Sequence, residues 1–454
     1  MLVKEQTYET DVAVIGGGCS GIAAAIAAAR IGANVIIVDR LGFLGGMATA
    51  ALVSPMMTFH AKSGQIIDGI GQQLVDRLHE QGFSPGHVPD TIGFVPTVTP
   101  IDPEGFKLIA MEMVLEAGAK PLLHQLVVDV DSDNGKVKSV IAVGLTSLSR
   151  IKASVFIDCT GNARLVELGG GELACGREAD SLTQPATMIF RVGNVDLHEI
   201  VDFIKANPED FILGCAPQDL DAEQPLAVAG FFGKVREGVE HGVFHVDRDR
   251  LLLFSGVMPG EVVVNVTRVK VLDPADPVDI TRAEIEGRRQ VYDVFQFLKT
   301  RIPGFSAAQL IGTGCQIGIR ETSRPVGDYI LTQEDLLSGR DFADSVARGA
   351  FPIDIHSPDG KGLTALKLDR SYAIPYRCLR PKGLTNLLCA GRAISVTHEA
   401  YASTRVMPTC LATGQAAGTA AAIAIGREGD VRDIDIDVLR ATLVRNGAIL
   451  YEPS

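Results

Sequence analysis

Blocks of hydrophobic residues broken by glycine occupy the first forty positions of the chain. Residues 11–15 (DVAVI) form a short apolar run, which is typical of a parallel strand buried on both faces. The alanine-rich residues 22–30 predict a helix, and residues 34–38 (NVIIV) predict a second buried strand that ends at Asp39. The pattern therefore predicts a strand–helix–strand unit at the start of the chain.

Residues 106–161 predict a further part of the same sheet with a different connection. Residues 106–119 predict a helix closed by Gly118, and residues 120–125 predict a strand. The runs 126–130 and 136–144 predict two strands around an Asn-Gly turn, which is a strong hairpin signal. An apolar strand at 153–161 follows, so we expect a β-meander that leads back into a parallel sheet.

The pattern changes between about residues 162 and 375. The runs 187–196 and 260–269 predict strands, and residues 280–301 predict a long amphipathic helix. After this stretch, residues 384–392 predict an apolar strand, and Pro408 suits the first turn of a helix. Gly414 and Gly418 give that helix a thin face, able to lie against the alanine-rich helix near the N-terminus. We therefore expect a discontinuous first domain, residues 1–161 and 376–454, and a substrate or cap domain over residues 162–375.

A glycine fingerprint, Gly16-x-Gly18-x-x-Gly21, lies between the first predicted strand and helix. In this context the first glycine makes a tight turn, the second lets the backbone approach a pyrophosphate, and the third allows close helix–strand packing. Asp39 lies at the distance expected of an acid that accepts hydrogen bonds from a ribose. The expected fold class is thus α/β: a Rossmann-like dinucleotide-binding domain with a parallel sheet and a β-meander, plus a mixed α+β substrate or cap domain. The Gly45–Gly46 loop is either a flexible turn or a wall along the extended dinucleotide.

Composition narrows the class of protein. Hydrophobic residues make up 46% of the chain and charged residues 21%, which is typical of a soluble globular protein. We expect no membrane span, no secretory signal and a cytoplasmic location. The eight cysteines include no C-x-x-C, so we expect no metal site, and the net charge of −13 argues against nucleic-acid binding.

The fingerprint alone does not separate NAD from FAD, but the far end of the chain does. Enzymes that dock NAD(P)H on its own domain usually carry a second fingerprint, and Gly312-x-Gly314 lacks the strand–helix context for one. A C-terminal strand and helix that return to the first fingerprint are what a flavin site needs. The positive end of that helix can stabilise negative charge on a reduced flavin.

Three motifs carry a family resemblance: GIRE-x-x-R at 318–324, PYRCL at 375–379 and AGR-x-IS-x-THEA at 390–400. With them the chain resembles the FAD-dependent oxidoreductases with a glutathione-reductase-type fold, distant relatives of the fumarate reductase flavoproteins. Ser323 and Pro325 depart from the family pattern, so no relative's substrate is transferred. The resemblance implies a Rossmann-like FAD-binding domain with non-covalent FAD, held by Gly16, Gly18, Ser20, Gly21, Asp39, Arg40, Gly46, Met47, Thr49, Val127, Thr160, Gly161, Gly391, Arg392, Met407, Pro408 and Thr409.

The loop before the C-terminal helix supplies the first catalytic candidates. His398 is either a general acid/base, because imidazole titrates near neutral pH, or a loop residue bonded to its own backbone. Arg405 is expected to bind a substrate carboxylate or polarise a carbonyl, and Tyr401 is a third candidate. Arg320 and Arg324 form either an arginine pair for an anionic substrate or a salt-bridged structural turn.

These features predict a dehydrogenase or reductase that transfers hydride between FAD and a small, anionic organic substrate. Two alternatives stay open: a flavin monooxygenase or oxidase that uses O2, and an electron-transfer flavoprotein subunit of a larger redox complex. The expected partners are the small-molecule substrate and either a second copy of the chain or a redox protein.

Overall fold

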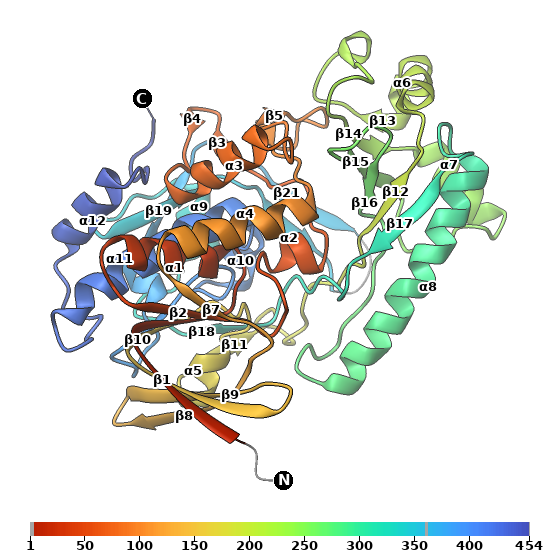
Figure 1. Cartoon of the computed structure of the whole chain (residues 1–454). Helices are drawn as coiled ribbons and strands as arrows, with labels where there is room; N and C mark the ends of the chain where they lie inside the picture. Colours follow the sequence, from red (N-terminus) through yellow and green to blue (C-terminus); the bar gives the residue numbers. More distant parts are fainter. Residues whose placement is uncertain (1–3, 359–361, 454) are drawn as a thin grey trace.

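The computed structural model describes residues 4–358 and 362–453, which form two packed bodies (Figure 1). The larger body is built on a seven-stranded sheet in the order β7-β2-β1-β10-β9-β8, with β23 paired to β10. The strands β7, β2, β1, β10 and β23 are parallel, and β10, β9 and β8 form an antiparallel meander. The α/β fold with a parallel sheet and a β-meander is thus confirmed. The bounds are β1 (Lys4–Ile15), β2 (Val35–Val38), β7 (Lys120–Leu122), β8 (Leu126–Asp133), β9 (Lys136–Val143), β10 (Ser147–Asp158) and β23 (Leu387–Cys389).

The apolar runs of β1 and β2 are continuous because both faces of these strands are buried. Val12 and Val14 face a core shared with the helices, whereas Ala13 and Ile15 face a second core under the meander. Residues 35–38 of β2 alternate in the same way. The helices α1 (Cys19–Arg30), α3 (Ile70–Glu80), α4 (Pro103–Glu116) and α11 (Met407–Ile425) contribute to the first core and lie together above the sheet in Figure 1.

The hairpin of β8 and β9 turns at Asn134 and Gly135, whose φ angles are 49° and 76°. Positive φ at both central residues is the requirement of a type I′ turn, which the Asn-Gly pair meets. The meander follows directly from this local signal.

The smaller body holds a six-stranded antiparallel sheet covered by α8 (Pro277–Arg301). The buried residues of α8 recur at helical spacing, among them Ala283, Val291 and Leu298, and Asp276 caps its first turn. Gly312 lies in the edge strand β17, so the second glycine pair forms no nucleotide loop. The strands are β12 (Phe190–Gly193), β13 (Phe211–Ile212), β14 (Ala227–Gly230), β15 (Leu251–Ser255), β16 (Val262–Val264) and β17 (Gln309–Thr313), flanked by α6 (Leu197–Ala206) and α7 (Phe232–Glu240).

The hydrophobic cores of the two bodies are drawn from unequal parts of the sequence. The buried residues of the second core run from Ala186 to Ile317, whereas residues 331–379 contribute to the first core. The domain boundaries at 161 and 375 stay a prediction. The remaining elements are α2 (Met47–Ala50), β3 (His60–Ala61), β4 (Gly64–Gln65), β5 (Val88–Pro89), β6 (Thr97–Val98), α5 (Arg164–Leu168), β11 (Leu173–Cys175), η1 (Pro208–Asp210), η2 (Pro217–Asp219), β18 (Ser323–Pro325), α9 (Gln333–Leu337), β19 (Ser345–Gly349), β20 (Ile353–His356), β21 (Leu363–Leu366), β22 (Tyr372–Pro375), η3 (Tyr376–Leu379), α10 (His398–Thr404) and α12 (Ile436–Arg445).

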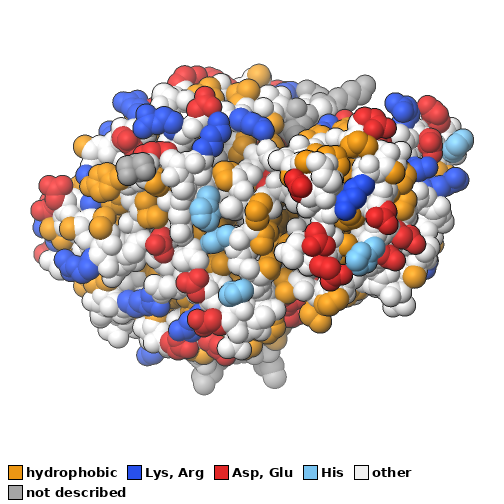
Figure 2. All heavy atoms as spheres, turned by 90° about the horizontal axis from the view of Figure 1, so that it is seen from above, with side chains coloured by type: hydrophobic (Ala, Val, Ile, Leu, Met, Phe, Trp, Pro, Cys, Tyr) orange, Lys and Arg blue, Asp and Glu red, His pale blue; other side chains and the backbone are white. Residues whose placement is uncertain are grey.

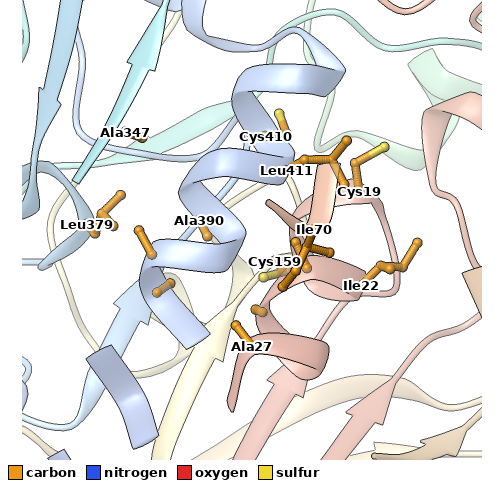
Figure 3. Packing of buried hydrophobic residues seen from close by; sticks show 14 of the residues in the cluster. Cys19, Ile22, Ala27, Ile70, Cys159, Ala347, Leu379, Ala390, Cys410 and Leu411 are labelled. Atoms are coloured by element: carbon orange, nitrogen blue, oxygen red, sulfur yellow. The ribbon is translucent and has the colours of Figure 1, made fainter. Parts of the chain in front are cut away.

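Helices α1 and α11 lie side by side (Figure 3). They pack directly because α11 has glycine, which lacks a side chain, where it faces α1. A Cβ on Gly414 would lie 2.8 Å from the Cα of Ser20, and one on Gly418 would lie 2.8 Å from the Cα of Ala24. Since both contacts advance in the same direction along the chain, the two helices are parallel. Their N-termini therefore lie at the same end of the pair.

Candidate active site

The phosphate-binding end of the fingerprint is built by three glycines with different constraints. Gly16 has a φ of 104°, and a Cβ there would lie 2.6 Å from the carbonyl carbon of Cys159. A Cβ on Gly21 would lie 2.9 Å from the carbonyl carbon of Gly16. At Gly18, by contrast, the nearest atom to an added Cβ is the Cα of Gly46 at 3.7 Å, so this position leaves room for a ligand. No side chain caps the first turn of α1, so its amide groups are available to an anion.

Asp39 is held at the end of β2 by two backbone amides. Gly17 N–H donates to Oδ2 at 2.6 Å, and Leu41 N–H donates to Oδ1 at 2.7 Å. Burial raises the pKa of this carboxyl group. The Gly45–Gly46 loop lies beside the fingerprint, since Gly45 N–H donates to Gly17 O at 2.8 Å. This arrangement favours the predicted wall over a flexible turn.

The other predicted cofactor residues surround the same end of the sheet. Arg392 Nε donates to Gly161 O at 2.7 Å, and Gly391 N–H donates to the Thr413 hydroxyl at 3.1 Å. Arg40 donates to Gln316, Thr49 donates to Leu44 O at 3.0 Å, and Thr160 donates to Asp158. Val127 is buried in β8, and Ser20 is buried in the first turn of α1.

Helix α11 begins at Met407, with Pro408 in its first turn and no side-chain cap. Two uncapped, parallel helix N-termini thus face one side of the molecule, next to a glycine cradle with room at Gly18. A pyrophosphate at α1 and a reduced flavin at α11 each bring the negative charge that such an end stabilises. The residues present therefore fit FAD.

The family model for FAD-dependent oxidoreductases matches residues 11–443. The chain belongs to this family. FAD is accordingly its cofactor, as predicted.

Two named relatives share shorter segments with this oxidoreductase. The thiamine thiazole synthase of Methanococcus aeolicus is 31% identical over 160 residues, which cover 35% of this chain and 53% of that protein. The urocanate reductase of Eggerthella lenta is 35% identical over 75 residues, 16% of this chain and 12% of that protein. The chain thus matches about half or less of the length of these relatives.

Among solved structures, a geranylgeranyl bacteriochlorophyll reductase-like protein from Thermoplasma acidophilum is 11% identical. Its TM-score is 0.48, and the alignment covers 98% of this chain and 97% of that one.

A cavity of about 920 Å³ continues from the predicted FAD residues into the smaller body. Met47, Arg392 and Met407 line one end of it, and Ile189, Leu252 and Phe254 of the second sheet line another. Figure 2 shows hydrophobic side chains around a hollow between the two bodies. Further apolar lining comes from Val53, Met57, Ile92, Phe94, Ile212 and Phe351.

Positive charge dominates one part of the cavity wall, where four arginines gather: Arg248, Arg268, Arg320 and Arg405. Burial and mutual repulsion lower the pKa of Arg248 to about 10, and they hold that of Arg320 well below its ordinary value. Asp354 is the one carboxylate of the described residues within ion-pair distance of any of these four, 3.5 Å from Arg405. The other cavity carboxylates are exposed or committed elsewhere, as Asp249 is to Arg250 at 2.8 Å.

Several polar atoms of this wall are buried without a partner in the part of the chain that the structure describes. They are Arg268 Nε, Arg405 Nε, Asn265 Oδ1 and His356 Nδ1. Buried polar groups in native proteins are nearly always hydrogen-bonded. Four such atoms in one cavity leave this wall free to hydrogen-bond a polar ligand.

The predicted catalytic residues are divided between the cavity and the polar network behind it. Arg405 lines the cavity, but His398 and Tyr401 do not. His398 Nδ1 lies 2.8 Å from Glu321 Oε1, and both side chains are buried. The Tyr401 hydroxyl is buried without a partner among the described residues. The catalytic roles of these three residues stay predictions, and their placement favours Arg405.

The two candidate substrate arginines are likewise separated. Arg320 lines the cavity and donates at 2.6 Å to Pro185 O and to the Thr187 hydroxyl. Arg324 lies outside the lining, and its guanidinium is fully used by Glu321, Val396 O and Gly176 O. The arginine pair thus divides into one cavity residue and one salt-bridged structural residue.

Sequence analysis missed the polar pair of β20, Asp354 and His356. Ile353 and Ile355 of this strand pack on the first core, whereas Asp354 and His356 face the cavity. The alternation in PIDIH was the available signal, since polar residues at i and i+2 share one face of a strand. Arg248 and Arg268 carried no motif at all.

Among the described residues, no helix is long and apolar enough to cross a membrane. Nor do the described histidine, cysteine and acidic side chains form any cluster able to hold a metal ion. The eight cysteines are free thiols, and burial raises the pKa of Cys19 in the phosphate loop to about 12.

Proposed function

We propose that this oxidoreductase acts on a small organic anion with an apolar body, bound in the cavity between the two bodies. The main support is the group of four arginines, of which Arg405 alone has an ion pair among the described residues, with Asp354. Because an uncompensated cluster of buried cations is unfavourable, an anionic ligand is the natural partner of this wall. The apolar lining from the second sheet suits the remainder of the substrate.

Within this proposal, FAD supplies the hydride acceptor or donor when it is bound. Arg320 and Arg405 bind the anionic group and orient the substrate toward the end lined by Met407. Ile189, Leu252 and Phe254 exclude water from the opposite side. The uncapped first turn of α11 stabilises negative charge that develops at its end of the cavity.

The lining of the cavity by residues of this one chain supports substrate chemistry here rather than on a partner. An electron-transfer subunit has no need of an arginine-lined wall in the cavity beside its flavin. The dehydrogenase or reductase function is therefore favoured over that alternative.

The test is a titration of the FAD-loaded protein with carboxylates of increasing apolar length, followed by the flavin absorption spectrum. Benzoate should perturb the spectrum, and benzamide, its neutral counterpart, should bind at least tenfold more weakly. In Arg405→Met and Arg320→Met, loss of a charged hydrogen bond of about 1.5–3 kcal/mol weakens benzoate binding about 10- to 150-fold.

Arg288→Met is the matched control, because it removes the same charge outside the cavity. Arg288 pairs with Glu284 on the surface of α8. Equal binding of benzoate and benzamide, or an equal loss in the control variant, would contradict the proposal.

A further inference from the structure

Asp354 and His356 form a side-chain pair that faces the arginine wall of the cavity. Strand β20 places them two residues apart on one face, with His356 Nε2 3.3 Å from Asp354 Oδ2. The strand is fixed at this point, since His356 N–H donates to Gln184 Oε1 at 3.2 Å. Both side chains are largely buried.

The geometry sets the roles of the two imidazole nitrogens. Nε2 lies against a carboxylate, which accepts a hydrogen bond, so Nε2 carries the hydrogen of the neutral ring. Nδ1 is then left with its lone pair, buried and without a partner in the described part of the chain. A purely structural histidine would have both nitrogens satisfied.

The same carboxylate connects the histidine to the anion-binding residue. Arg405 lies 3.5 Å from Asp354 Oδ2, and its Nη2 donates to Asp354 O at 3.4 Å. Asp354 thus aligns the imidazole and the guanidinium beside one another at the cavity wall.

We propose that His356 is the group that exchanges a proton with the substrate and that Asp354 positions it. This inference rests on the proposed binding of an organic anion in the cavity. In the oxidative direction, FAD when bound would accept a hydrogen with its electron pair from a substrate carbon and so be reduced. The adjacent O–H or N–H bond breaks, its proton goes to His356 Nδ1, and its electron pair becomes the new π bond. The reductive direction returns both in the opposite sense.

The surroundings of His356 make its proton affinity depend on the ligand. Burial and the neighbouring Arg320 lower the pKa of His356 to about 3, against the opposing effect of Asp354. Arg248 acts in the same direction as Arg320, and Arg268 and Arg405 complete the positive wall. An anion among these arginines cancels much of their field and, at a distance of a few ångströms, raises the pKa of His356 by about 1–3 units.

The test is a pH titration of the FAD-loaded protein from pH 4.5 to 8. NMR of ¹³C-labelled histidine measures the chemical shift of each histidine ring. His356→Gln and His398→Gln assign the two signals. Without an anion, the His356 ring should stay neutral across this range. With saturating benzoate it should begin to titrate within this range, and the His398 signal should not respond to benzoate.

The variants separate this inference from the proposed function. His356→Gln should keep benzoate binding within threefold and lose the ligand-linked titration. Asp354→Asn should shift the benzoate-bound pKa of His356 downward, since the carboxylate that stabilises the imidazolium is gone. If benzoate does not bind the wild-type protein, the proposed anion site is wrong. If it binds but the His356 ring does not respond, or the His398 ring responds in its place, the anion site stands and His356 is not the proton carrier.

Discussion

The contact between α1 and α11 permits a quantitative prediction for Gly418→Ala. Gly418 faces the backbone of α1, where an added Cβ would lie 2.8 Å from both the Cα and the carbonyl carbon of Ala24. Real Cβ atoms essentially never approach other heavy atoms within 3.0 Å. Because the obstacle is backbone and not the end of a flexible side chain, the two helices have to move apart.

Two opposing effects set the change in the free energy of unfolding that Gly418→Ala causes. Alanine is favoured over glycine in a helix interior by about 1 kcal/mol. Overpacking of a close contact costs about 1–3 kcal/mol, and a backbone obstacle favours the upper end of that range. The expected net loss in the free energy of unfolding is therefore about 2 kcal/mol.

Gly426→Ala is the matched control on the same helix. Gly426 is the C-cap of α11 with a φ of −67°, and the nearest atom to an added Cβ is Ile423 O at 3.8 Å. This substitution should leave stability unchanged or raise it by about 0.5 kcal/mol.

Urea unfolding of the FAD-loaded proteins, followed by circular dichroism, measures the difference. Gly418→Ala should unfold at clearly lower urea than wild type, and Gly426→Ala at the same urea or higher. Coincident midpoints for the two variants would refute the close parallel packing of α1 on α11.

Three further predictions concern the cofactor, the buried network and pH. Gly414→Ala pushes on Ser20 in the first turn of α1, so FAD should dissociate faster on dilution, as recovery of free-flavin fluorescence reports; unchanged retention contradicts the placement of that turn. Glu321→Leu leaves the buried Arg324 without its carboxylate, so the free energy of unfolding should fall by about 3–5 kcal/mol. A fall of less than about 1 kcal/mol contradicts a structural ion pair. Burial lowers the pKa of His87 to about 4 from its ordinary 6.5, so between these values the unfolded chain binds more protons than the folded one. Stability should therefore fall as the pH drops from 6.5 toward 4, and His87→Gln should reduce that slope in urea unfolding at pH 7, 6 and 5; an unchanged slope contradicts a neutral, buried His87.

The parts of the fold that the sequence predicted are those where local patterns and packing demand the same residues. The Asn134–Gly135 turn needs positive φ at both positions, and Gly414 and Gly418 need the absence of a side chain against α1. Such constraints act within a few residues or between two helices, so they leave a readable signature. The α/β class, the meander and the return of the C-terminal helix were predictable for this reason.

The cavity wall was only partly predictable, because it is assembled from segments far apart in the chain. Arg320 belongs to a motif and Arg405 lies just before the C-terminal helix, whereas Arg248 and Arg268 come from loops around the second sheet and carry no spacing signal. His398 has every local feature of a catalytic histidine, yet Glu321 occupies its Nδ1. Whether a polar side chain faces a cavity or a buried partner depends on tertiary packing.

The composition of the wall also implies an order of events at the proposed site. The four arginines repel one another, and burial together with Arg320 and Arg248 lowers the pKa of His356 and keeps it neutral for as long as no anion lies among them. A proton placed on His356 before the anion binds would add a fifth positive charge to this wall, which is unfavourable in a buried setting. The anion therefore has to bind first, and proton transfer becomes favourable only on a substrate that is already held. This coupling restricts acid–base chemistry to the loaded cavity, which is a physical reason for the fold to retain an otherwise costly group of buried charges.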